Sequence, residues 1–397
     1  MDELVKKAKT MQAELIKHRR YLHQHAECGF ALTKTTAYIK EQLEGMGYTP
    51  KKYGKAGLVA EVGKGGKRVL LRADMDALPL VEQSGVSYAC KDGNMHACGH
   101  DLHAAMLLGA AKLLKEREGV LKGVVRLLFQ PAEEVLEGAK NCIDAGVLDG
   151  VDCAAMIHVL TAIDLPMGAV IVSSKGVSAP AADYFSIEIK GKGCHGSSPW
   201  KGVDPLTAAS HILLGLQALS ARELSPQQTA VLTIGCIQTG EAGNALSDSA
   251  ILKGTLRAFD EEVRALVKTR MEEIAKKIAQ AFRAKAKIIY GGCCPTLVND
   301  EKLSALAYEE AKRLFGEERV ATSESMGGDV RNKEGGSEDF AYISHEVPSV
   351  MFALAAGEKR EGYHYPLHHP RVKFDESVLP IGAALYAGVA QKWLLEA

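Results

Sequence analysis

RVLLRADM (68–75) is a short apolar run that predicts a buried β-strand, and it opens a strand–helix–strand pattern. The apolar positions of DLHAAMLLGAAKLLKE (101–116) recur at helical spacing, so this segment predicts an α-helix. VVRLLFQ (124–130) is a continuous apolar run, typical of a strand that is covered on both faces. Strands that alternate with helices indicate an α/β domain whose mixed, mainly parallel sheet is flanked by helices.

The pattern changes near residue 181, where YFSIEIKGKG (184–193) alternates like a strand with one exposed face. From there to residue 292 the predicted order is strand, helix, strand, strand, helix, strand, which is the ferredoxin-like α+β arrangement. The α/β style returns after Pro295. We therefore expect a catalytic domain in two parts, 1–181 and 294–397, interrupted by a smaller inserted domain at 182–293.

The composition argues against several classes of protein. The 48 basic and 49 acidic residues nearly balance, which argues against a nucleic-acid or membrane-surface partner. The first 30 residues predict one helix. Their charged start MDELVKKAKTMQAELIKHRR lacks the apolar stretch of a signal peptide, and we expect no run long enough to span a bilayer. Nine scattered cysteines indicate reduced thiols. A cytoplasmic protein is expected, rather than a secreted binding protein held together by disulfides.

Metal-ligating and titratable side chains concentrate in a few places, most of them at the ends of predicted strands or helices, where sites form in open α/β sheets. They are Asp74 and Asp76 in RADMDALP; His96, Cys98, His100, Asp101 and His103 in HACGHDLHAA; Glu133 and Glu134 in FQPAEE; His158 in MIHV; and His364, His368 and His369 in YHYPLHHP.

A thiolate and imidazoles mixed with carboxylates suit manganese, zinc, cobalt or nickel rather than calcium or magnesium. Of the adjacent pair Glu133 and Glu134, one can bind metal while the other takes the proton of an activated water. Each group alone has a structural alternative: the aspartates could cap a turn, the glutamates could be solvated, and Cys98 could be a buried thiol. Their joint occurrence favours a metal centre.

Seven motifs, in the same order, resemble those of the N-acyl-amino-acid amidohydrolases, which include aminoacylases, hippurate hydrolases and plant auxin-conjugate hydrolases, in a larger group with carboxypeptidase G-type metallopeptidases. The motifs are RRYLHQHAECGF, RADMDALP, HACGHDLHAA, FQPAEE, GKGCHGSSP, GSEDFAY and LHHP. The resemblance implies two divalent metal ions bridged by Cys98, with His100, Glu134, His158 and His368 as the other ligands. It implies Glu133 as general base and Asp76 as the group that orients a ligand histidine.

The same resemblance implies that the inserted domain, residues 182–293, serves as a lid and dimerisation domain. His195 in GKGCHGSSP would stabilise the tetrahedral oxyanion and would come from a partner subunit. Asn244 and Arg257 match positions that face the substrate. The resemblance further implies a homodimer, or a tetramer, formed through the inserted domain. An apolar stripe on the predicted helix 261–284 is the sequence clue to this assembly.

The departures from the family pattern lie beside the site and spare every expected ligand. Leu102 replaces a glycine; Val135, Leu136 and Glu137 replace a glycine-rich stretch; and Tyr21, Ala26 and Cys28 alter the first motif. We expect metal-dependent hydrolysis of the amide bond of an N-acyl or N-aroyl amino acid, a small-molecule substrate. The alternatives are a dipeptidase or carboxypeptidase of the same group, and an inactive metal-binding homologue, which would have lost a ligand or the base.

Overall fold

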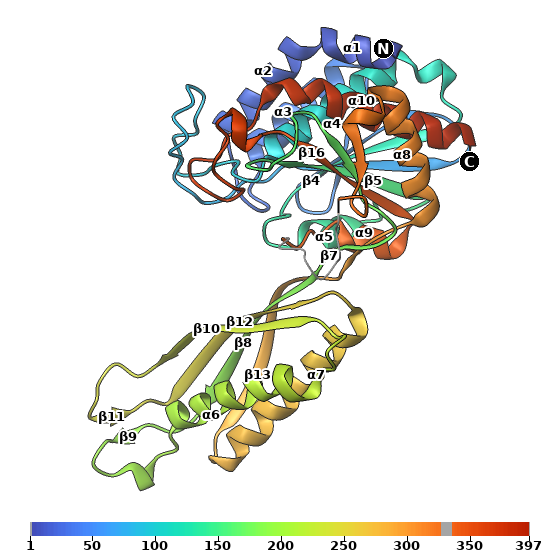
Figure 1. Ribbon diagram of the computed structural model, residues 1–397. Coiled ribbons are helices and arrows are strands. Elements are labelled where there is room, and N and C mark those ends of the chain that lie inside the picture. The colour runs from blue at the N-terminus through green and yellow to red at the C-terminus, as the bar shows by residue number, and fades with distance from the viewer. Residues whose placement is uncertain (1, 327–335, 397) are drawn as a thin grey trace. The chain divides into compact units, whose positions relative to one another are not determined.

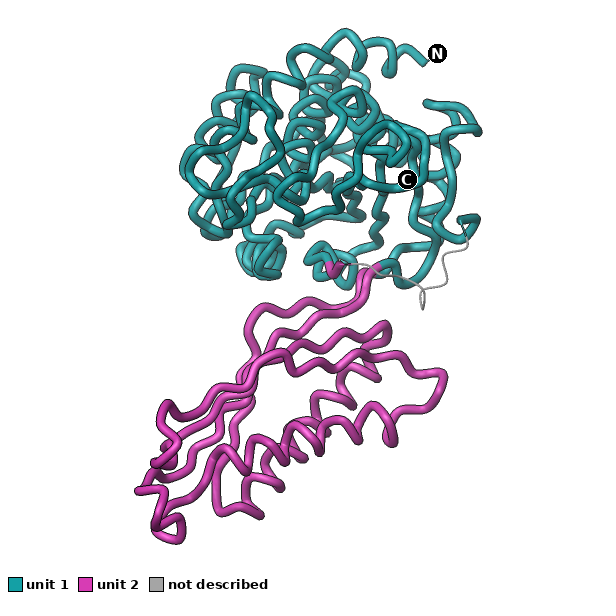
Figure 2. Tube along the Cα trace, turned by 60° about the vertical axis from the view of Figure 1, so that its left-hand side comes forward, with its two compact units in different colours: residues 1–178, 298–329, 338–397 teal, residues 179–297, 330–337 magenta. Residues whose placement is uncertain are grey.

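The computed structural model describes residues 2–326 and 336–396. These residues form two compact units (Figure 2). Unit 1 comprises residues 2–178, 298–326 and 338–396, and unit 2 comprises residues 179–297 together with 336–337. Unit 2 is therefore an insertion in unit 1. We still propose that the inserted domain comprises residues 182–293.

Unit 1 is built on one eight-stranded sheet. The strands, in spatial order, are β1 (Lys51–Tyr53), β2 (Gly57–Gly63), β4 (Val124–Gln130), β3 (Arg68–Asp74), β5 (Cys153–Leu160), β16 (Ser349–Ala355), β6 (Val170–Val172) and β15 (Val320–Thr322). The central run β4–β3–β5–β16 is parallel, as is β6–β15. The pairs β1–β2, β2–β4 and β16–β6 are antiparallel. The expected mixed, mainly parallel sheet is confirmed.

Helices cover both faces of this sheet (Figure 1). One face carries α1 (Glu3–Thr10), α2 (Gln12–Gln24), α3 (Thr33–Gly45), α4 (His100–Glu116), α8 (Glu301–Phe315) and α10 (Leu379–Glu396). The other face carries α5 (Gly138–Asp144) and α9 (Ala341–Glu346). All seven residues of β4 are buried, as expected of a strand between two helical layers. The single helix expected at the N-terminus is divided at Met11, whose N–H bonds to the Ala8 carbonyl.

The C-terminal helix corrects one expectation. Residues Glu376–Glu396 are long and apolar enough to cross a membrane, with a mean hydropathy of 1.3, although no such run was expected. Within unit 1, however, 72% of this segment is buried, and α10 packs on α4 and β3. Its apolar composition is that of a core helix, surrounded by protein on most sides.

Unit 2 has a four-stranded antiparallel sheet with two helices. Its strands, in spatial order, are β10 (Ala230–Thr239), β12 (Ser249–Ala258), β8 (Ala181–Lys190) and β13 (Lys285–Cys294). The helices are α6 (Pro205–Ala218) and α7 (Glu261–Ala281), and Figure 1 shows them on the same face. The chain order β8-α6-β10-β12-α7-β13 confirms the expected inserted ferredoxin-like domain. Two small two-stranded sheets pair β9 (Cys194–His195) with β11 (Ala245–Leu246), and β7 (Gly176–Ala179) with β14 (Leu297–Asn299).

Candidate metal centre

The expected site residues of unit 1 gather at one edge of the large sheet. Strands β4, β3 and β5 are parallel neighbours, so their carboxyl ends share that edge. Asp76 follows β3, Glu133 and Glu134 follow β4, and His158 lies near the end of β5. His100 begins α4, which packs against β3. The fold therefore explains how positions up to 82 residues apart in this region of the chain meet.

Cys98 is the common member of two groups of potential metal ligands. The ligand atoms of Cys98, His100 and His158 all lie within 4.8 Å of one another, and so do those of Cys98, Glu134 and His368. The Cys98 Sγ atom is 3.6 Å from His158 Nε2 and 3.3 Å from His368 Nε2. The structure thus brings all five expected ligands together, with the thiol between the two groups.

Two buried atoms of the cluster fit the binding of metal ions. His100 Nε2 and Glu134 Oε1 are 3.9 Å apart, and neither has a hydrogen-bond partner in the described part of the chain. A buried polar atom without a partner costs about 1–3 kcal/mol, which an ion bound between such atoms would offset. The set of one thiol, three imidazoles and one carboxylate suits divalent ions of the zinc or manganese type. The residues present therefore fit a metal pair.

Backbone carbonyls fix the orientation of two ligand imidazoles. His100 Nδ1 lies 2.9 Å from the Asp76 carbonyl oxygen, and His158 Nδ1 lies 2.7 Å from the Val159 carbonyl oxygen. A carbonyl oxygen can only accept, so each Nδ1 carries the proton and donates it. Each Nε2 is then unprotonated in the neutral ring and faces the cluster with its lone pair, as a metal ligand requires.

Asp76 contacts both the ligand His100 and the turn that carries Glu133 and Glu134. Its carbonyl accepts from His100, whereas its carboxylate accepts the backbone N–H groups of Glu133 and Glu134 at 3.0 and 3.2 Å. The turn that carries the glutamates is closed by the Leu136 N–H, which donates to the Glu133 carbonyl at 2.7 Å. The contact between Asp76 and a ligand histidine is made through the backbone carbonyl, with the carboxylate Oδ1 3.6 Å from His100 Nδ1, and the carboxylate also positions the glutamate turn.

Unusual backbone conformations concentrate at the centre. Gly99 has φ +88°, and a Cβ at this position would come within 2.4 Å of Val159 Cγ2, so only glycine fits between Cys98 and His100. Three of the five non-glycine residues with positive φ in the described chain are also here, namely Ala132, Leu136 and His368. Each such residue costs roughly 1–2 kcal/mol, and strain of this kind is typical of functional sites.

At His100 burial is outweighed by the nearby Asp74 carboxylate, which raises the pKa of that imidazole well above its usual range. Burial dominates the proton affinities of the other cluster members. It raises the pKa of Glu134 to about 7 and that of Glu133 well above its usual range, and it lowers the pKa of His158 to about 3. Burial also raises the pKa of the Cys98 thiol. The protein alone disfavours the charged forms of these groups, whereas bound cations would favour the thiolate and the carboxylates.

A buried ion network beneath the site was not foreseen. Arg72 is fully buried and pairs with Asp74 at 2.7 Å and with Glu338 and Asp339 at 2.8 Å. The carboxylates of Glu133, Glu338 and Asp339 lie within 4.8 Å of one another. Asp74 stands in RADMDALP, where it was a candidate ligand, and Glu338 and Asp339 stand in GSEDFAY, but neither motif by itself predicts an ion network with Arg72. An arginine in an otherwise apolar strand was the available signal, because a buried guanidinium needs several carboxylates.

Other motif residues support the site without facing it. His103 Nδ1 donates to Asp74 Oδ1 at 2.5 Å, and His103 Nε2 accepts the Val159 N–H at 2.9 Å, so both ring nitrogens are occupied. Asp101 pairs with the buried Arg19 at 2.7 Å and with His23 at 2.8 Å. These residues are structural parts of HACGHDLHAA rather than candidate ligands.

Of the three expected site residues of unit 2, His195 and Asn244 lie together and Arg257 lies apart from them. His195 in β9 pairs with Ala245 in β11, and the Asn244 carbonyl accepts the Gly196 N–H at 2.7 Å, so His195 and Asn244 are neighbours. Both are exposed. Arg257 lies opposite Ala182, at the start of β8, whereas His195 follows the end of that strand. Eight strand residues span roughly 26 Å, so Arg257 lies at the other end of the unit.

Comparison with known proteins gives a consistent picture. The profile described as peptidase family M20/M25/M40 matches residues 70–392. N-acetyl-L-cysteine deacetylase of Bacillus subtilis is 38% identical over 392 residues, covering 98% of this chain and 89% of that one. Hippurate hydrolase of Campylobacter jejuni is 36% identical, covering 97% of each. The crystal structure of a dinuclear metal-binding peptidase of the M20 family from Bacillus subtilis has a TM-score of 0.79 and 34% identity, covering 98% of this chain and 100% of that one.

Proposed function

Because the chain belongs to the peptidase family M20/M25/M40 and is a metal-dependent hydrolase of N-acyl amino acids, we propose that the Cys98 cluster is its catalytic centre. The observation that carries this proposal is the place of Cys98 in both ligand groups, since one thiolate shared by two sites can hold two ions close together. Cys98, His100 and His158 would hold one ion, and Cys98, Glu134 and His368 would hold the other. Manganese, zinc, cobalt and nickel all suit these ligands.

A divalent pair supplies Lewis acidity at the amide carbonyl and lowers the pKa of water to roughly 7. Glu133 accepts a proton from the water that adds to the carbonyl carbon. It then donates that proton to the amide nitrogen as the carbon–nitrogen bond breaks, which yields a carboxylic acid and a free amino acid. Its position supports this role, because Asp76 holds its backbone and Glu133 Oε2 lies 3.9 Å from His100 Nε2.

Three residues of unit 2 have proposed roles in the reaction. His195 stabilises the oxyanion of the tetrahedral intermediate, and Asn244 and Arg257 contact the substrate. The separation of roughly 26 Å between the two ends of β8 supports a contribution from a second copy, because one copy of unit 2 cannot present all three residues at one point. We therefore assign His195 to the partner subunit.

A homodimer, or a tetramer built from it, forms through unit 2. The apolar stripe on α7, which includes Val263, Val267 and Met271, is buried within its own unit, so the contact between copies uses exposed side chains. Leu266 on α7 is 38% exposed, and further exposed apolar side chains lie on α6 and on the edge strand β10. They are Leu206 (50% exposed), Leu214 (67%), Val231 (53%) and Ile237 (43%).

Sedimentation of the wild type and of Leu214→Glu tests this assembly. We expect a dimer or tetramer for the wild type, and a smaller species with strongly reduced activity for the variant. A fully active monomer at low protein concentration would contradict both the interface and the origin of His195.

We place the protein in the cytoplasm, without a nucleic-acid or membrane partner. All nine cysteines are free thiols, which a reducing compartment favours. The near balance of acidic and basic residues supports the absence of a polyanionic partner.

The activity is tested with a panel of N-acetyl, N-benzoyl and succinyl amino acids next to free dipeptides, with metal analysis of the same sample. We expect hydrolysis of the acyl amino acids, and faster cleavage of the dipeptides would favour the peptidase alternative. Glu133→Ala should lower kcat at least about a hundredfold. Glu137→Ala, an exposed glutamate on the same loop, is the matched control and should keep its activity. Equal activity of the two variants would exclude Glu133 as the base.

A further inference from the structure

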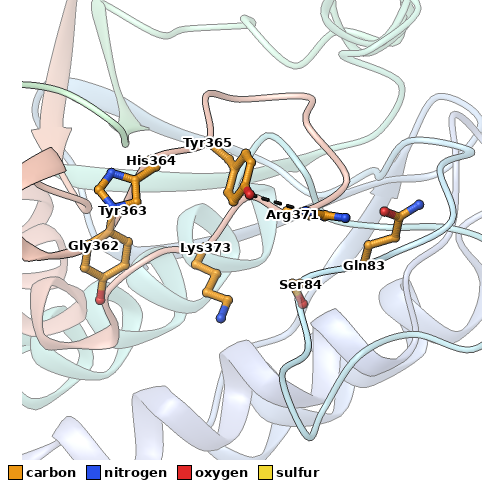
Figure 3. Close-up of a pocket in the computed structure, with 8 residues that line it drawn as sticks. All are labelled: Gln83, Ser84, Gly362, Tyr363, His364, Tyr365, Arg371 and Lys373. Atoms are coloured by element: carbon orange, nitrogen blue, oxygen red, sulfur yellow. Dashed lines mark hydrogen bonds between the residues drawn. The ribbon is translucent and has the colours of Figure 1, made fainter.

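A cavity of about 380 Å³ lies in unit 1, in the loop region that carries His368 (Figure 3). Gln83 and Ser84 line it from one loop, and residues 362–365, Arg371 and Lys373 line it from another. Its volume falls near the lower end of the roughly 300–1,000 Å³ typical of small-ligand sites. The proposed reaction leaves this cavity without a role.

The cavity is cationic. Arg371 and Lys373 both line it, and no carboxylate does. Within residues 2–326 and 336–396, the side chain of Arg371 contacts a phenol, and neither cation has a carboxylate partner within 4.0 Å. Lys359, in the same region of the chain, pairs with Asp164 in the usual way. Two unpaired cations at one concave surface favour a negatively charged ligand.

The acidic residues around the cavity are already engaged. Asp375 accepts from the Tyr363 hydroxyl at 3.0 Å, and Glu376 pairs with Arg20 at 2.6 Å. Glu82, which lies beneath Ser84, is buried and accepts hydrogen bonds from that serine and from a buried imidazole. These carboxylates therefore leave the charge of Arg371 and Lys373 available to a ligand.

Arg371 is held in place without using most of its donors. The Tyr365 ring stacks on His369, with centroids 4.4 Å apart and planes at 18°. Arg371 Nη1 donates to the Tyr365 hydroxyl at 3.4 Å, and the Arg371 backbone N–H donates to His369 Nδ1 at 3.1 Å. Figure 3 shows Arg371 between Tyr365 and Gln83. The remaining guanidinium donors form a fork that matches the two oxygens of a carboxylate.

The cavity is close to the metal centre along the chain. Tyr365 lies three residues before His368 and Arg371 three residues after it. An extended residue spans at most roughly 3.6 Å, so both Cα atoms lie within about 11 Å of that of His368. The His368 backbone N–H also donates to the Ala97 carbonyl, next to Cys98, at 2.9 Å. The cavity is therefore lined by the same loop that supplies the proposed ligand His368.

We propose that this cavity is a carboxylate subsite, with Arg371 and Lys373 as its binding residues. The carboxylate has two possible sources: a second carboxylate on the substrate, as in an N-acyl glutamate, or the carboxylic acid that hydrolysis releases. The proposal rests on the proposed hydrolase function for its choice of ligand, because that reaction brings both kinds of carboxylate to the site.

Calorimetric titration of the metal-loaded protein distinguishes the two sources. The probes are N-acetyl-L-glutamate, the equally shaped but less charged N-acetyl-L-glutamine, and acetate. Binding is compared between Arg371→Gln and Arg117→Gln, both in a Glu133→Ala background that keeps the probes intact. Arg117 is the matched control, because it is an exposed arginine at the far end of α4, outside the cavity.

If the substrate supplies the carboxylate, Arg371→Gln weakens binding of N-acetyl-L-glutamate at least about tenfold and leaves N-acetyl-L-glutamine within about twofold. If the released acid supplies it, acetate binding is weakened about tenfold and the two acyl amino acids are unaffected. Equal affinities of Arg371→Gln and Arg117→Gln for all three probes would overturn the proposal. Turnover in the Glu133→Ala background would instead count against the proposed base, and the acetate titration would still report on the cavity.

Discussion

Gly99→Ala should destabilise unit 1 and weaken the metal centre, because this glycine links two proposed ligands where no side chain fits. The backbone φ is +88°, which L-residues adopt only with strain. A Cβ would meet Val159 Cγ2 at 2.4 Å and the Phe374 ring at 3.2 Å. Val159 and Phe374 are buried, so neither can move away freely. The chain must shift instead, and Cys98 and His100 shift with it.

The magnitude has two parts. The left-handed conformation costs alanine about 1–2 kcal/mol, and insertion of a methyl group into a packed region costs about 1–3 kcal/mol. The sum is about 2–5 kcal/mol. At about 2–4 °C per kcal/mol, the melting temperature of unit 1 should fall by about 4–20 °C. Calorimetry of the chelated protein measures this fall, and metal analysis after loading should find fewer than two ions per chain.

Gly362→Ala is the matched control. Gly362 has nearly the same backbone conformation, with φ 96° and ψ 7° against 88° and 16° for Gly99, but its Cβ would meet nothing within 4 Å. It should lose only the backbone part, about 1–2 kcal/mol. Equal melting temperatures for the two variants would refute the argument that the contact with Val159 makes glycine necessary.

Three further predictions concern the centre itself. Glu133→Gln should lose at least about a hundredfold in kcat with two ions still bound, and metal analysis beside kinetics checks it; loss of metal would mean that Glu133 is a ligand. Cys98→Ala should lose both ions and His158→Ala only one, as measured by metal analysis after dialysis; equal losses would contradict the bridge. Burial raises the pKa of Glu134 to about 7 from 4.5, so the folded metal-free protein binds more protons than the unfolded chain between these values. This carboxyl therefore stabilises the fold less as pH rises from about 4.5 to 7, by up to about 1.4 kcal/mol per pH unit. Glu134→Gln should remove that dependence from the melting temperature of chelated protein, and an unchanged pH profile would contradict it.

The fold was predictable because its signals are local. Apolar runs such as VVRLLFQ (124–130) specify buried strands, and the β-α-β-β-α-β order of residues 184–292 is readable from periodicity alone. The break of the N-terminal helix at Met11 was missed, since helical residues continue on both sides of it. The expectation of no membrane-length apolar run was also wrong, because the buried core helix α10 is as long and apolar as a membrane-spanning helix.

The ligands of the metal centre could be predicted from the sequence, but the buried ion network that supports them could not. The five expected ligands meet, because each lies at or next to the end of an element and the parallel strands align those ends. The partners of Arg72 come from residues 74, 338 and 339, and no local pattern announces a pairing across more than 260 positions. Arg257 was grouped with His195 by resemblance, whereas strand register places them at opposite ends of unit 2.

The insertion also sets an order of events during synthesis. Unit 2 is almost wholly continuous in sequence, so it can fold as soon as Leu297 has left the ribosome. Unit 1 must wait for β16, for His368 and for α10, which lie in the last hundred or so residues. At about 5–20 residues per second, this delay is roughly 5–20 s. During that time Cys98, Glu133 and Glu134 have been synthesised but His368 has not. Under the proposed ligand assignment, a complete pair of metal ions can therefore bind only late in synthesis.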